Sequence, residues 1–166
     1  SLRSIEKYAA DLVRNVYVIG PAPAWYNGLT IQHERVDGDS GNADQLRKLI
    51  AAAQHPDVSE DFVWMNTDFY CQHRPDFEAR SYLASKVMRN GQHKGYMNNT
   101  VLALRWQNVE GPYRDHELHV PMLMNKQHVI TMASMVPFGD IAFRTLYVNL
   151  FVKDGATMHV VNISDE

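Results

Sequence analysis

The residues best suited to chemistry follow directly after an apolar segment. Residues 61–65 read Asp-Phe-Val-Trp-Met, which is typical of a buried strand. Asn66, Thr67 and Asp68 come next, at the carboxyl end of the strand, where open α/β sheets bind ligands. A lone carboxylate beside an amide and a hydroxyl favours a Mg²⁺ site that substrate phosphates and water complete. The alternative is a polar turn in which Asn66 and Asp68 hydrogen-bond local backbone amides.

Two later segments carry further polar groups. Residues 115–121 crowd His, Asp and Glu beside an expected strand, so they are candidates for a metal ligand or a general base. The alternative there is a solvated loop. On the expected helix near residue 144, Arg144 and Tyr147 share a face, and an arginine in this position is able to grip a phosphate with two hydrogen bonds. The alternative is a surface arginine beside a core tyrosine.

A basic segment lies within this acidic chain. Residues 72–96 hold five cationic side chains against two carboxylates, with tyrosine and histidine between them. Such a patch favours contact with a nucleic-acid backbone and stacking on its bases, whereas the alternative is a solvated helix face. The cationic residues are Arg74, Arg80, Lys86, Arg89 and Lys94.

These side chains need secondary structure that positions them. Apolar periodicity and turn residues predict alternating strands and helices, which indicates a mostly parallel sheet covered by helices. Residues 100–106 fit a helix or a strand equally well. The expected strands are 15–19, 29–33, 61–66, 117–124 and 157–163. The expected helices begin at residue 2 and span 43–54, 77–89, a short stretch from 125, and 140–150.

Composition narrows the class of protein. A chain of 166 residues with 45% hydrophobic content predicts one domain, 1–166, and excludes intrinsic disorder. No apolar stretch reaches the roughly 20 residues of a membrane span, and the single cysteine fits a reducing cytoplasm. The formal charge of −3 excludes a broadly basic nucleic-acid coat but leaves room for a local patch.

Four blocks in order along the chain resemble the conserved blocks of the Stealth family. These are capsular-polysaccharide sugar-phosphate transferases, related to the catalytic part of the lysosomal-enzyme GlcNAc-phosphotransferase, and phage glycosyltransferase-like proteins share the blocks. Where the family has Asn-Asp-Asp, this chain has Asn66-Thr67-Asp68, and its Phe-Arg-Thr-Leu-Tyr-Val-Asn is similar to the family's Phe-Arg-Ser-Leu-Tyr-Gly-Asn. The matching blocks are residues 1–9 with 13–19, 57–70, 119–121 with 125–126, and 143–149.

The resemblance implies a GT-A-like fold, a nucleotide-diphosphate sugar as donor (a UDP-sugar above all) and a divalent metal, Mn²⁺ or Mg²⁺. It implies that Asp68 is a catalytic metal carboxylate, that His119 is a metal ligand or catalytic base, and that Arg144 holds the donor diphosphate. The family opens with a strand that precedes the first of these blocks, so the first strand of the fold is expected to be missing from this sequence. The further donor-binding residues implied are Asn42, Arg47 or Lys48, Asn66, Thr67, Tyr147 and Asn149.

The function expected from these observations is transfer of a hexosyl group from a nucleotide sugar. The phage-like resemblance and the basic segment favour an acceptor in DNA, the hydroxymethyl group of a modified pyrimidine such as 5-hydroxymethylcytosine in a bacteriophage genome, within the host cytoplasm. One alternative is a sugar-phosphate transferase acting on a polysaccharide, which would release a nucleoside monophosphate instead of a diphosphate. Another is a degenerate binding module without catalysis.

Overall fold

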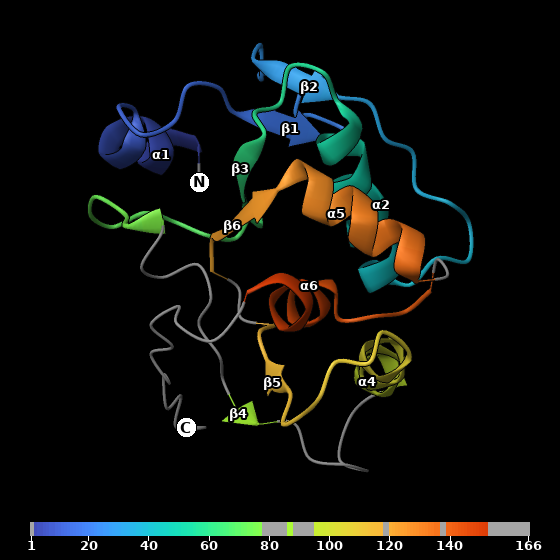
Figure 1. Cartoon of the computed structure of the whole chain (residues 1–166). Coiled ribbons are helices and arrows are strands. Elements are labelled where there is room, and N and C mark those ends of the chain that lie inside the picture. The colour runs from blue at the N-terminus through green and yellow to red at the C-terminus, as the bar shows by residue number, and fades with distance from the viewer. Residues whose placement is uncertain (1, 78–85, 88–94, 118–119, 137–138, 153–166) are drawn as a thin grey trace, which may run out of the picture.

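The computed structural model describes residues 2–77, the backbone of 86–87, and residues 95–117, 120–136 and 139–152 (Figure 1). Within these ranges helices and short strands alternate, so the chain is a mixed α/β protein. In order, the elements are α1 (Leu2–Ala9), β1 (Tyr17–Ile19), β2 (Leu29–Ile31), α2 (Gly41–Gln54), β3 (Asp61–Trp64), β4 (Lys86–Val87), α4 (Gly95–Trp106), β5 (Arg114–Asp115), β6 (Met122–Asn125), α5 (Lys126–Met135) and α6 (Phe143–Phe151).

The strands form three two-stranded sheets in the part of the chain that is described. β1 and β2 are parallel, with Tyr17 opposite Leu29, whereas β3 and β6 are antiparallel, with Trp64 opposite Met122. β4 and β5 are also antiparallel. The prediction of a mostly parallel sheet is therefore wrong for two of the three pairs, because apolar periodicity identifies a strand but carries no information about the direction of its partner.

Helix α2 forms where the sequence predicts it. The Ser40 hydroxyl accepts a hydrogen bond from the Ala43 amide, which caps the first turn, and apolar residues then recur at helical spacing. This apolar face packs against α5, which lies beside α2 in Figure 1. Its most buried core residues are Leu46, Leu49, Ala52 and Ala53.

The β3–β6 pair brings the end of β3 next to α6. Met122 and Met124 point into the core on alternate positions of β6, and the indole of Trp64 meets the ring of Phe143 edge-on, with centroids 6.2 Å apart. Residues 143–148 of α6 are all buried. This packing fixes residues 65–68 beside the first turn of α6, which places the predicted site in space.

Two further predictions have outcomes in the structure. Residues 95–106 form helix α4, which settles the open choice for 100–106. The predicted helix over 77–89 is wrong at Lys86–Val87, which pair with β5 as a strand. Residues 78–85 and 88–89 of that helix lie outside the described residues, and so does the predicted strand 157–163.

None of the described helices has the length and apolar character needed to cross a bilayer.

Candidate functional site

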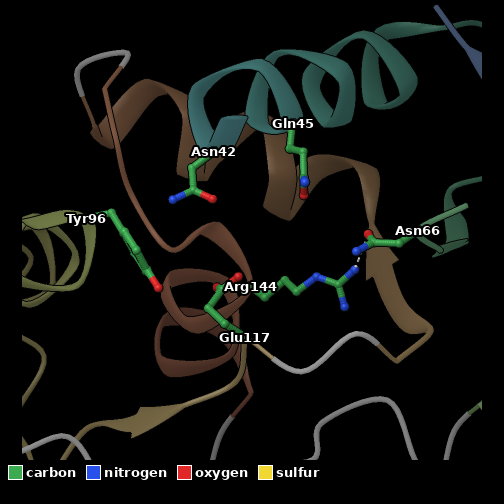
Figure 2. A pocket seen from close by; sticks show the side chains of 6 residues that line it. All are labelled: Asn42, Gln45, Asn66, Tyr96, Glu117 and Arg144. Carbon is green, nitrogen blue, oxygen red and sulfur yellow. Dashed lines mark hydrogen bonds between the residues drawn. The ribbon is translucent and has the colours of Figure 1, made fainter. Parts of the chain in front are cut away.

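A small polar cavity of about 130 Å³ lies where α2, α4, α6 and the end of β3 meet (Figure 2). Every side chain on its wall carries a hydrogen-bonding group. Asn42 and Gln45 project from α2, while Arg144 extends from α6 toward Asn66. The lining residues are Asn42, Gln45, Asn66, Tyr96, Glu117 and Arg144.

Arg144 is the most buried charged side chain of the cavity, with 2% of its surface exposed. One Nη atom donates to the carbonyl oxygen of Val120 at 2.7 Å, and the other donates to Oδ1 of Asn66 at 2.8 Å. Burial lowers the pKa of Arg144, and the negative charges of Glu117 and Asp68 act in the opposite direction. The guanidinium is therefore fixed in place before any ligand arrives.

Glu117 faces the same cavity and is held by the first turn of α6. Its carboxylate accepts a hydrogen bond from the backbone amide of Thr145 at 3.0 Å, while the Thr145 hydroxyl accepts one from the His116 amide. Burial raises the pKa of Glu117, against the effects of the Thr145 amide and the Arg144 charge. The cavity wall thus carries one acidic and one basic side chain, and burial destabilises the charged form of each.

Asp140 ties the cavity wall together. Its Oδ1 accepts hydrogen bonds from the Ser40 hydroxyl at 2.8 Å and the Asn42 amide at 3.1 Å. Its carbonyl oxygen accepts one from Asn99 of α4 at 2.9 Å. The pKa of Tyr96 is raised by burial and by the carboxylates around it, among them Asp140. These contacts join α2 and α4 to the segment that leads into α6.

A much larger groove of about 1960 Å³ adjoins the cavity, since Gln45 and Asn66 line both. Its walls include β1 and β3, and α1 lies along one side. Residues 66–68 stand at the junction, and Asp68 is exposed there. The small polar cavity and the larger groove therefore share part of their wall.

The structure brings several of the predicted donor-binding residues to this site. Asn42, Asn66 and Arg144 line the cavity. Lys48, Thr67 and Asp68 line the groove, and the Lys48 ammonium donates to Oδ2 of Asp44 at 2.7 Å.

Two predicted donor-binding residues lie elsewhere. The hydroxyl of Tyr147 accepts a hydrogen bond from the Asn125 amide at 2.8 Å, and its ring packs on Phe151. The side chain of Asn149 binds the backbone of Arg114 through both its oxygen and its nitrogen. Neither residue lines the cavity or the groove, and the contacts described for both lie within the packing around α6.

The predicted nucleic-acid contacts are described only in part. Arg74 lines the groove and forms an exposed ion pair with Asp11. Lys86 is described only as backbone, in β4. Arg80, Arg89 and Lys94 lie outside the described residues, and so does the predicted metal ligand and base His119.

Few side chains in the described ranges are placed to coordinate a divalent metal. Across the described ranges, no group of three or more His, Cys, Asp or Glu side chains gathers in a way that would hold an ion. Asp68 supplies one exposed carboxylate, and Asn66 already accepts from Arg144 through its oxygen. One carboxylate is compatible with Mg²⁺ or Mn²⁺ only where substrate phosphates and water provide the remaining ligands.

Three cavity residues, Gln45, Tyr96 and Glu117, were not among the individual site residues expected from the sequence. Gln45 is three residues after Asn42 on α2, which puts both on one face of the helix. Glu117 lies within the polar segment 115–121, where the sequence indicates chemistry without choosing a residue. The sequence marks Tyr96 only as an aromatic residue of the basic segment 72–96, because its place in the cavity depends on how α4 packs against α6.

Comparisons with known proteins add no relative: no family model, no curated protein and no solved structure matches this chain.

Proposed function

We propose that this chain is a nucleotide-sugar-dependent glycosyltransferase with a GT-A-like fold. The observation that carries the proposal is the polar cavity that adjoins the groove at the carboxyl end of β3. Amides, a phenol, a carboxylate and a guanidinium are the groups that pair with the many hydroxyls of a sugar. The groove is large enough for the nucleotide part of the donor.

The proposed role of each residue follows from its position at the site. The amides of Asn42 and Gln45 and the carboxylate of Glu117 orient the sugar by hydrogen bonds to its hydroxyls. Arg144 supplies a fixed positive charge near the leaving diphosphate, where negative charge develops as the bond to the anomeric carbon breaks. A divalent ion bound at Asp68 would add positive charge to that diphosphate. His119 is proposed as the base that takes the proton of the acceptor hydroxyl, on the resemblance alone.

For the acceptor we propose the hydroxymethyl group of a modified pyrimidine in DNA. This choice rests on the basic segment 72–96 and the phage-like resemblance. A base in a duplex is buried in the stack, so it has to be flipped out before its hydroxymethyl oxygen reaches the anomeric carbon.

The decisive experiment is mass spectrometry of nucleosides. DNA containing 5-hydroxymethylcytosine is incubated with the protein, Mn²⁺ and a panel of UDP-sugars, and matched DNA with unmodified cytosine serves as the control. We expect a hexosyl mass increase on hydroxymethylcytosine only, with release of a nucleoside diphosphate. Release of a monophosphate would indicate sugar-phosphate transfer instead, and a labelled polysaccharide with unlabelled DNA would overturn the DNA acceptor.

A further inference from the structure

Trp25 is the most exposed of the large apolar side chains in the described ranges, with 74% of its surface open to solvent. A single exposed aromatic residue is ordinary on a protein surface. Trp25 differs because it lines the groove together with Pro21 and Pro23, just after the carboxyl end of β1. Its exposed indole is therefore part of the wall of the candidate donor site.

The loop that carries Trp25 is anchored on both sides. The hydroxyl of Tyr26 lies 3.2 Å from the carbonyl oxygens of Val16 and of Leu29, the residues next to β1 and at the start of β2. The backbone amide of Tyr26 donates to the Pro23 carbonyl at 2.8 Å, and this hydrogen bond closes a turn that contains Trp25. The indole of Trp25 meets the Tyr26 ring edge-on, at 86°.

Gly28 makes this arrangement possible. A Cβ atom at position 28 would clash with the hydroxyl oxygen and the ring carbons of Tyr26, because it would lie closer to them than side-chain carbons approach in proteins. Only glycine allows the tyrosine to fold back onto the strands. The loop is therefore built to hold Tyr26 still, and it leaves Trp25 facing outward.

The groove connects this indole with the polar groups of the site. The same groove is lined by Lys48 on α2 and by Asn66 and Asp68, and the Lys48 side chain lies near Gly20 at the start of the Trp25 loop. The groove wall therefore includes an aromatic surface, a cation and a carboxylate, and Asn66 also lines the polar cavity. A base, phosphates and a sugar are the groups that such a wall and cavity suit.

We propose that Trp25 is the stacking platform for the base of the nucleotide donor, an assignment that rests on the proposed function. Base stacking on an aromatic side chain tolerates every base, since each has a π face, and its removal typically weakens binding about 10- to 100-fold. Trp25 thereby sets affinity for the nucleoside part, while Lys48 and the cavity act on the phosphates and the sugar.

Nucleotide binding without turnover tests this inference. The affinities of UDP, CDP, ADP and GDP in the presence of Mg²⁺ are measured by calorimetry on the wild-type chain, on Trp25→Leu and on Trp106→Leu. Trp106 is a matched control, because it is 67% exposed on α4 and does not line the groove. We expect Trp25→Leu to weaken the tightest nucleotide about 10- to 100-fold and Trp106→Leu to leave it unchanged.

Inorganic pyrophosphate, which has no base, separates stacking from a general disturbance of the groove. Its affinity should be equal in the wild type and in Trp25→Leu. If the wild type binds a nucleotide and Trp25→Leu binds it equally well, the stacking role is overturned while the proposed function stands. Equal weakening of nucleotide and pyrophosphate also overturns it. If no nucleotide binds the wild type, the proposed function fails first, and the stacking role fails with it.

Discussion

The charged cluster around Asp44 on α2 and the charged residues Arg144 and Glu117 of the cavity show opposite electrostatics. In one, Oδ1 of Asp44 lies 2.8 Å from Nε2 of His33 and Oδ2 accepts from Lys48 at 2.7 Å. Burial acts against the Asp44 carboxylate, but these hydrogen bonds outweigh it, and the pKa of Asp44 falls below its ordinary value. At the cavity, burial has the largest effect on both Arg144 and Glu117. It lowers the pKa of Arg144 and raises the pKa of Glu117, so in each case it favours the neutral form.

The difference separates a cluster whose charges the fold compensates from one whose charges burial leaves less stable. The Asp44 cluster satisfies its own charges and joins α2 to the residues after β2, so it stabilises the fold. The Arg144 and Glu117 pair keeps charges in a desolvated cavity where the surrounding protein does not fully compensate them. Charges held in this way are typical of sites that complete their electrostatics with a ligand. The comparison predicts that the two clusters respond differently to the same kind of mutation.

The largest effect is expected at Arg144. Arg144→Ala removes a buried guanidinium, its attraction for the Glu117 carboxylate and its hydrogen bonds to the Val120 carbonyl and the Asn66 side chain, so it should lower the free energy of unfolding by about 3–5 kcal/mol. Urea denaturation measures this loss.

The matched variant is the double change Arg144→Met with Glu117→Gln, which removes both charges and keeps the volume. It should recover most of the lost stability while transfer activity stays absent. A loss below about 1 kcal/mol in Arg144→Ala would contradict the claim that this charge is buried and held by its hydrogen bonds.

Asp68 lies at the edge of the cavity and should matter for transfer more than for folding. Asp68→Asn is expected to lower the rate of transfer at least about 100-fold, since it removes the carboxylate that is proposed to hold the metal. The free energy of unfolding of Asp68→Asn should differ from that of the wild type by about 1 kcal/mol or less, because Asp68 is exposed.

Asp61→Asn is the control for Asp68→Asn. Asp61 is also an exposed carboxylate that lines the groove, but it lies at the opposite end of β3. Nucleoside mass spectrometry on both variants checks the pair. Equal activity in the two variants would remove Asp68 from the proposed metal site.

The Asp44 cluster should reveal itself in the pH dependence of stability. Asp44→Asn is expected to cost about 1–3 kcal/mol at neutral pH, where it weakens two charged hydrogen bonds. A carboxyl whose pKa is depressed in the folded state stabilises the fold above the unfolded-state pKa of about 3.9, and this contribution is lost as the pH falls through the folded-state pKa.

Urea denaturation across that acidic range should therefore show the wild type and Asp44→Asn converging. Asp11→Asn, in the exposed pair with Arg74, should change stability much less at any pH. A difference between wild type and Asp44→Asn that is independent of pH would show that packing, not charge, explains the effect.

The smallest effect is expected at Tyr96. Tyr96→Phe removes one hydroxyl from the cavity wall, so the KM for the sugar donor should rise about 2- to 10-fold while kcat stays close to the wild-type value. Tyr113→Phe is the control, because the Tyr113 hydroxyl donates to the Val109 carbonyl and does not line the cavity. Steady-state kinetics on both variants would contradict the role of Tyr96 if their KM values were equal.

Local patterns in the sequence predict the elements better than their pairing. The apolar spacing after residue 43 places α2 within two residues of its observed start. The apolar run 61–65 likewise predicts β3. The antiparallel partner of β3 was not predicted, because strand direction depends on a segment about 60 residues later in the chain.

The site shows the same division on a smaller scale. Asn66, Asp68 and Arg144 stand out from the sequence, and the structure joins Asn66 to Arg144 across 78 positions. The resemblance implied donor-binding roles for Tyr147 and Asn149 as well, because they belong to the same block as Arg144. A helix that is buried all round has no single apolar stripe, so its periodicity does not tell which face meets a ligand.

The sequence by itself determined the local elements, the polar residues that follow β3 and the resemblance that assigns them chemistry. These depend on neighbours within a few positions, which a single chain displays directly. Only the tertiary structure decided that Glu117 and Tyr96 complete a polar cavity, that Tyr147 and Asn149 lie in the packing, and that Trp25 faces the groove. Those outcomes depend on burial and on contacts between distant segments, and the folded arrangement of α2, α4 and α6 alone sets them.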